Sequence, residues 1–259
     1  LANNELHLVY QPVMSPHSNK VVGAEALLRW RHPTLGLLTP SSFVDLAEES
    51  GAIVPIGEWV IRQACSDMRM WLNDKRIDRQ FIVHVNVSPR QVGDTRFVER
   101  TLAAIKDFDL QPQHLALEFD EKMLMKDTSN TLRTLQSMKR FGVRLSIDDF
   151  GTGYSCLATL KDIPASKLKI DRAFIAPLPD DKRVFAMVKA ITQLGHELDM
   201  TVVAEGVENN AQLDSVHKAG VDAIQGFLHT RPMHERELLD WLLEQKKIDW
   251  AADNYSKRR

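Results

Sequence analysis

Polar side chains interrupt the apolar, strand-like runs of this sequence at similar places. A buried charge is costly unless it is paired or bound to a metal ion. Seven successive runs carry such residues, most of them at or near the C-terminal end of the run: Glu25, Asn86, Glu118, Asp148 with Asp149, Lys169 with Asp171, Glu205 and Gln225. Any one alone could be a satisfied buried group or a loop cap. Independent structural pairs would not all choose the same end, so together they predict one polar site.

The donor types in this set narrow the chemistry. Carboxylates and an amide supply oxygen ligands, which suit Mg²⁺ or Mn²⁺ rather than Zn²⁺. The adjacent Asp148 and Asp149 can hold two ions if one carboxylate bridges them. Paired divalent ions are the usual device for in-line attack on a phosphodiester. Lys169 could neutralise developing phosphate charge, or it could form a salt bridge to Asp171 or another acid.

Other catalytic arrangements find little support in the sequence. The 9 His include no HExxH pair, and His84, two residues before Asn86, is expected to face inward as a core or supporting residue. Cys65 lies in a helical pattern and Cys156 has no nearby His, so Cys–His catalysis is not expected. Two Cys also cannot build a disulfide framework, which fits a reducing compartment.

Composition excludes several classes of protein. The 259 residues are 44% apolar, enough to form a core, and disorder is not expected. Lys and Arg (33) nearly balance Asp and Glu (35), so the net charge of −2 offers no footprint for a DNA or RNA polymer. No apolar run approaches the ~18 residues of a membrane span. The chain begins at Leu1 rather than Met, and we expect it to be part of a longer protein.

Strand-like and helical patterns alternate along the chain and indicate one α/β domain. Strands are predicted at 6–13, 21–30, 81–87, 115–120, 144–150, 167–171, 201–207 and 223–228. Helices are predicted at 41–51, 56–74, 95–107, 128–140, 181–198, 209–219 and 234–246. Gly142, Gly195 and Gly220 stand where helices are expected to stop.

Eight strands alternating with helices predict a TIM-like (β/α)₈ barrel, whose active site lies at the C-terminal ends of its strands. Residues 14–20 between the first two strands are too few for a parallel crossover, so the first strand should be antiparallel. A doubly wound open sheet is the alternative. Its phosphate-binding fingerprint is missing, because GTGYSC at 151–156 lacks the third glycine of GxGxxG.

Ten short motifs occur in order along nearly the whole chain. They are YQP (10–12), EALLRW (25–30), RHP (31–33), FVDLAEESG (43–51), VNVS (85–88), LEFDE (117–121), DDFGTGYS (148–155), LKIDRAFI (168–175), VVAEGVE (202–208) and QGFL with RP (225–232). Each is weak alone, but the ordered set resembles bacterial EAL domains, the phosphodiesterases that hydrolyse cyclic di-GMP. The family's barrel also has an antiparallel first strand.

The resemblance implies a metal and catalytic set. Glu25, Asn86, Glu118 and Asp148 would bind the first of two Mg²⁺ or Mn²⁺ ions, with Asp148 bridging to a second ion on Asp149. Lys169 would lie beside the attacking water, which Glu205 would orient or deprotonate, and Asp171 would support this set. The family also implies that Ca²⁺ permits substrate binding and blocks hydrolysis.

The resemblance also implies substrate contacts and partners. The expected contacts are Gln11, Leu28, Arg29 on a phosphate, Glu208 and Phe227 on a guanine, Gln225, and Pro232 flanking the base. Glu121 would steady the loop at 150–156, which in the family lies near a homodimer contact. We expect an EAL domain at 1–247, a tail at 248–259, an upstream GGDEF or sensor domain, and a cytoplasmic location, whether or not the parent protein is membrane-anchored.

Departures from the family pattern keep one alternative function open. Asp120 replaces a usual Thr, Cys156 a Ser and Phe227 a Tyr, and His229-Thr230-Arg231-Pro232 stands for Ser-Arg-Pro. None removes a proposed metal ligand. The expected function is hydrolysis of cyclic di-GMP to linear pGpG. A degenerate domain that binds the dinucleotide without cleaving it is the first alternative, and an unrelated metal-dependent barrel that abstracts a proton beside a carboxylate is the second.

Overall fold

The strands lie where the sequence predicts them. The computed structural model describes residues 1, 3–16, 20–74, 77–121, 123, 128–152 and 160–256, with side chains up to residue 245 except that of residue 128. The strands are β1 (Leu6–Met14), β2 (Val21–His32), β3 (Gly36–Leu38), β4 (Ile82–Asn86), β5 (Leu115–Asp120), β6 (Arg144–Phe150), β7 (Lys167–Ile170), β8 (Thr201–Glu205) and β9 (Ala223–Gln225). All eight predicted strands are present, and β3 is a short hairpin strand that the sequence did not reveal.

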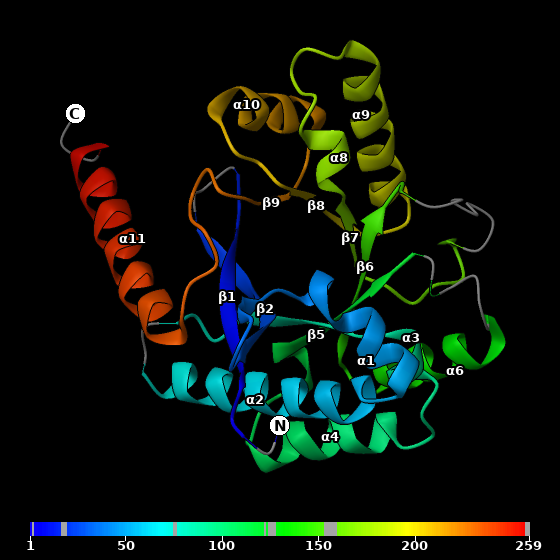
Figure 1. Ribbon diagram of the computed structural model, residues 1–259. Helices are drawn as coiled ribbons and strands as arrows, with labels where there is room; N and C mark the ends of the chain where they lie inside the picture. Colours follow the sequence, from blue (N-terminus) through cyan, green and yellow to red (C-terminus); the bar gives the residue numbers. More distant parts are fainter. Residues whose placement is uncertain are drawn as a thin grey trace.

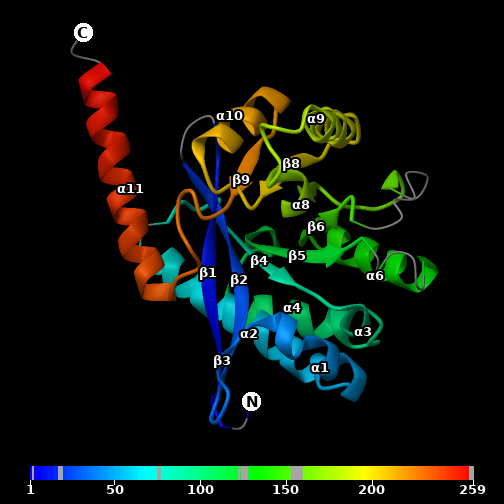
Figure 2. The same ribbon diagram turned by 45° about the horizontal axis from the view of Figure 1, so that its top comes forward.

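β1 closes the sheet into a barrel because it pairs with β2 on one side and β9 on the other. The order is β1-β9-β8-β7-β6-β5-β4-β2, with β3 appended to β2. Neighbouring strands from β2 through β9 are parallel in the barrel. β1 is antiparallel to both its neighbours, with Gln11 opposite Glu25 and Met14 opposite Ile224. The predicted TIM-like barrel with a reversed first strand is confirmed (Figures 1 and 2).

Helices are arranged around the outside of the barrel (Figure 2). They are α1 (Val44–Ser50), α2 (Ile53–Asn73), α3 (Pro89–Val92), α4 (Phe97–Asp107), α6 (Thr128–Arg140), α8 (Arg172–Ile175), α9 (Lys182–Glu197), α10 (Asn210–Ala219) and α11 (Glu235–Ser256), with 3₁₀ turns at Pro40–Ser42 and Pro112–His114. α2 shows how they pack, since Met68 and Trp71 on its inner face are fully buried. The Trp71 ring meets Tyr10 of β1 edge-on, with centroids 4.6 Å apart.

Two of the three expected glycine stops are confirmed, and one is wrong. Gly142 follows α6 and Gly220 caps α10, with φ of 91° and 84°, the left-handed conformation that glycine adopts without strain. Gly195 instead lies inside α9, which continues to Glu197. A Cβ at Gly195 would come within 2.5 Å of the Val202 side chain on β8. This glycine therefore permits close helix–strand packing rather than ending the helix.

The last helix crosses the predicted start of the tail. α11 begins beside β1 and its backbone runs to Ser256, projecting away from the barrel (Figures 1 and 2). The domain boundary at residue 247 stays a prediction. No helix within the described ranges is both long and apolar enough to cross a membrane.

Candidate active site

The C-terminal ends of the barrel strands carry one inward-facing ring of polar side chains. Side chains alternate between the two faces of a strand, so each strand offers one inward position at this level. The ring comprises Gln11, Glu25, Asn86, Glu118, Asp148, Lys169, Glu205 and Gln225. The sequence predicted each of these as a site residue, and the structure brings them to one mouth.

Lys169 is the buried cation of this ring. Its side chain is 2% exposed, and its Nζ lies 3.1 Å from Glu25, 2.7 Å from Glu118, 3.2 Å from Asp148 and 2.5 Å from Glu205. Burial alone would lower the pKa of Lys169, but these carboxylates hold it well above its usual value. The salt bridge considered for Lys169 therefore goes to the ring acids, whereas Asp171 accepts a hydrogen bond from Ala173 N (2.7 Å) at the start of α8.

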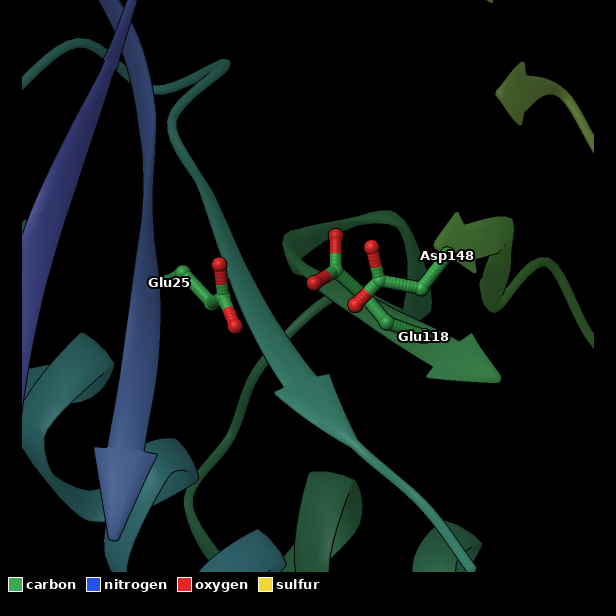
Figure 3. A group of neighbouring side chains, drawn as sticks. All are labelled: Glu25, Glu118 and Asp148. Atoms are coloured by element: carbon green, nitrogen blue, oxygen red, sulfur yellow. The ribbon is translucent and has the colours of Figure 1, made fainter. Parts of the chain in front are cut away.

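The carboxylates outnumber the ammonium that holds them. Glu25, Glu118 and Asp148 each offer an oxygen within 4.8 Å of the others, and Asp148 also belongs to a second such group with Asp149 and Glu205. Figure 3 shows the first group, with Glu118 and Asp148 side by side and Glu25 facing them from β2. Burial raises the pKa of Glu205 to about 7 and that of Asp148 well above its usual range, despite Lys169. This excess of negative charge is what bound cations would neutralise.

Two amide side chains orient Glu25. Asn86 Nδ2 donates to Glu25 Oε1 at 2.6 Å, and Gln225 Nε2 donates to Glu25 Oε2 at 2.8 Å. The same Gln225 nitrogen lies 3.2 Å from Gln11 Oε1, which extends the network to the reversed strand β1. Because Asn86 Nδ2 donates to Glu25, the side-chain oxygen Oδ1 is the Asn86 atom that could bind a metal ion.

Asp149 begins the loop after β6 in an uncommon conformation. Its φ is 52°, and its backbone N–H donates to Asp148 Oδ1 at 3.0 Å, which directs that carboxylate toward the ring. Burial and the neighbouring Asp171 raise the pKa of Asp149. Glu121 Oε2 accepts from Gly151 N at 3.3 Å, and its predicted role in steadying the loop stays a prediction. The rest of that loop, including Cys156, lies outside the described residues.

An open pocket of about 330 Å³ extends from the ring toward β8 and β9. Its lining includes the predicted contacts Gln11, Glu208, Gln225 and Phe227, together with Leu27, Arg172 and Gly206. Phe227 is 41% exposed, and the Arg231 guanidinium lies over its ring at 4.4 Å. Such a ring can stack on a planar base.

Arg172 is a pocket residue that sequence reasoning missed. Its guanidinium forms a salt bridge of 2.8 Å with Glu208 Oε1. A Cβ on Gly206 would come within 2.3 Å of the Arg172 side chain, so the glycine, at φ 71°, gives Arg172 its place. The available signal was a basic residue directly after Asp171 at the end of a strand.

The remaining predicted contacts, Leu28, Arg29 and Pro232, lie within the described residues but do not line this pocket. Arg29 donates to the Leu28 carbonyl at 2.8 Å, and burial lowers its pKa. Leu28 lines a separate, more apolar groove beside α1 that also contains Asn86 and Asp120. Pro232 adjoins Met233, whose backbone pairs with Tyr10 of β1. Their substrate contacts stay predictions.

Comparison with protein families supports the sequence resemblance. A family model described as "EAL domain" matches residues 1–232. The chain is 45% identical over 239 residues to the bifunctional diguanylate cyclase/cyclic di-GMP phosphodiesterase MucR of Pseudomonas aeruginosa, covering 92% of the chain and 35% of that protein. It is 36% identical over 236 residues to cyclic di-GMP phosphodiesterase PA2567 of the same organism, covering 91% and 40%. The chain thus spans about a third of the length of these relatives.

A solved structure shares the fold closely. The PaMucR phosphodiesterase in complex with c-di-GMP superposes with a TM-score of 0.87 at 44% sequence identity, covering 92% of this chain and 95% of that one.

Proposed function

The chain belongs to the EAL domain family, and we propose that it hydrolyses cyclic di-GMP to linear pGpG. Relatives at 36–45% identity are named cyclic di-GMP phosphodiesterases, and a similar structure holds this dinucleotide. The observation in this molecule that carries the proposal is the convergence of Glu25, Glu118 and Asp148 within 4.8 Å of one another around Lys169.

The donor set fits two divalent cations. Glu25, Glu118, Asp148 and the Asn86 carbonyl would hold the first, and Asp148 with Asp149 the second. Oxygen donors of this kind favour Mg²⁺ or Mn²⁺. When bound, the ions would supply Lewis-acid activation of the phosphodiester and a lowered pKa for water. Ca²⁺ has different geometric demands, and we expect it to support binding without turnover.

The side chains around the ions divide the remaining work. Glu205, which lies beside Lys169 in the ring, is the candidate to accept a proton from the attacking water. The water oxygen forms a bond to phosphorus, the P–O3′ bond breaks, and the leaving 3′-oxygen takes up a proton. Lys169 keeps the carboxylates together and offsets negative charge that develops on the phosphoryl group.

The pocket offers side chains that could recognise the nucleotide. Phe227 presents a ring for guanine stacking, and the Glu208 carboxylate can accept from the two N–H donors on the guanine edge. Arg172 fixes Glu208 for this contact. Gln11 and Gln225 line the floor, Arg29 would meet a phosphate, and Leu28 and Pro232 would border the bound dinucleotide.

The setting of the domain follows the family. We propose a homodimer, with Glu121 steadying the loop near the contact, and an upstream GGDEF or sensor domain in the parent protein. Residues 1–247 would form the catalytic domain, residues 248–259 the tail, and the domain would act in the cytoplasm.

Product analysis tests the proposal. Purified protein with cyclic di-GMP and Mn²⁺ should yield pGpG on chromatography, and substitution of Ca²⁺ should leave a bound, uncleaved dinucleotide. Glu25→Ala should abolish turnover, whereas Glu99→Ala, an exposed acid on α4, should leave it unchanged. Binding with no product in Mg²⁺ or Mn²⁺ would identify a receptor instead. Activity on a carboxylic acid but not on the dinucleotide would favour the proton-abstracting barrel.

A further inference from the structure

A second layer of inward-facing residues lies one step below the polar ring. Each strand contributes the residue two positions away from its ring residue: Val13, Gly23, His84, Ala116, Ser146, Lys167, Val203 and Ala223. Most of these are small or apolar, and Val13, Val203 and Ala223 form their own buried cluster. His84 and Lys167 are the titratable members. Two titratable side chains in an otherwise small or apolar layer require a structural explanation.

His84 joins Lys167 to the ring acid Glu118. Its Nδ1 lies 2.8 Å from Glu118 Oε1, and its Nε2 lies 3.1 Å from Lys167 Nζ. The other Glu118 oxygen, Oε2, faces Lys169 at 2.7 Å. The His84 and Glu118 side chains are each 1% exposed. Both Glu118 oxygens therefore have a fixed partner, one from below and one from the ring.

The partners of His84 determine which nitrogen carries the proton. A lysine ammonium can only donate, so Nε2 must accept from Lys167, and Nδ1–H is left to donate to Glu118. Space for the ring comes from Gly23 on β2, where a Cβ would lie 3.3 Å from His84 Nε2 and 2.6 Å from the Ile82 carbonyl. The barrel interior is thus shaped around one ring orientation and one tautomer.

We propose that His84, with its tautomer set by Lys167, is a positioning residue that holds the Glu118 carboxylate in the rotamer required for metal binding. This role rests on the proposed metal-dependent function. Partners that orient a ligand from behind commonly contribute 10–100-fold to metal affinity or activity. Without His84, Lys169 would be the one side-chain partner left to Glu118 among the residues that the structure describes, and the Glu118 carboxylate would be free to change rotamer within the ring.

Direct Mn²⁺ binding tests the role apart from catalysis, with free Mn²⁺ counted by electron paramagnetic resonance. His84→Leu should weaken Mn²⁺ binding about 10–100-fold. His84→Asn places an amide N–H close to the Nδ1 position and should recover most of that loss. Lys167→Met, which frees the tautomer, should weaken binding less than His84→Leu. Val13→Ala, in the same layer, is the control and should bind Mn²⁺ like the wild type. Circular dichroism and thermal unfolding without metal confirm that each variant is folded.

The outcomes separate this role from the proposed function. Wild-type Mn²⁺ affinity in folded His84→Leu would overturn the role, as would equal losses in His84→Leu and His84→Asn. Unchanged affinity in Lys167→Met would overturn the part assigned to Lys167. A wild-type protein that binds Mn²⁺ but forms no pGpG would refute the phosphodiesterase proposal, while the order of metal affinities would still decide the role of His84.

Discussion

Lys169 Nζ and Glu205 Oε1 lie 2.5 Å apart across the neighbouring strands β7 and β8. This is the shortest of four ion pairs that the one ammonium makes with ring acids. The Lys169 ammonium is therefore a fixed cation among acids that could also hold metal ions. Stability, metal binding and pH response are coupled through this pair.

Replacing Lys169 should expose the repulsion among the ring acids. In metal-free protein we expect Lys169→Met to lower the free energy of unfolding by about 3–5 kcal/mol, because buried carboxylates lose their counter-charge. Added Mn²⁺ should restore more stability to this variant than to the wild type. Urea unfolding with and without Mn²⁺ measures both effects, with the exposed Lys182→Met as control. Equal stability of Lys169→Met and wild type in chelator would contradict the expectation.

Glu205 predicts a specific pH dependence of metal-free stability. Its folded-state pKa of about 7 exceeds the ordinary 4.5, so the folded protein favours the protonated carboxyl. The stability that this preference contributes is complete below pH ~4.5 and is lost as the pH rises through 7. The stability of the wild type relative to Glu205→Gln should therefore fall across this range by on the order of 1–3 kcal/mol.

Urea unfolding in chelator at several pH values between 4.5 and 8 measures that difference. Glu99→Gln, on the exposed face of α4, is the control variant. A stability difference for Glu205→Gln that does not change with pH would contradict the raised pKa of Glu205.

Arg172 should affect substrate binding more than chemistry. It reaches Glu208 rather than the ring acids, so Arg172→Ala frees the carboxylate expected to hold a guanine. Loss of one charged hydrogen bond predicts about a tenfold rise in KM with little change in kcat. Steady-state kinetics with cyclic di-GMP check this, with the exposed Arg183→Ala of α9 as control. A matched fall in kcat at constant KM would place Arg172 in the chemical step instead.

The strand pattern and the ring acids were accessible from sequence for a simple physical reason. A carboxylate such as Glu118 at the end of an apolar run stands out locally, and parallel strands bring such ends together whatever the helices do. The short link at 14–20 likewise requires a reversed first strand. These features depend on the period of the apolar residues and on the number of residues between strands. Both can be counted within a short stretch of sequence.

Features that depend on packing between distant segments were not accessible. Gly195 resembles a helix stop locally, yet its lack of a Cβ serves contact with Val202 on β8. In the sequence, Arg172 resembles an ordinary surface basic residue. Its position beside Glu208 depends on Gly206, whose missing Cβ leaves room for the Arg172 side chain.

A final prediction concerns the contact that anchors the reversed strand to α2. The Tyr10 hydroxyl donates to Asp67 Oδ2 at 2.5 Å, and Gln63 Nε2 donates to Oδ1 at 2.8 Å. Tyr10 and Asp67 are both buried, so Tyr10→Phe would leave a carboxylate oxygen without its donor. We expect the free energy of unfolding to fall by about 1–3 kcal/mol.

In an Asp67→Asn background the same substitution should cost less, because a neutral amide loses less when its donor is removed. Urea unfolding of the four proteins in this cycle measures the coupling, and a coupling of zero would mean that packing of the Tyr10 ring against Trp71, rather than the hydrogen bond, anchors β1 to α2.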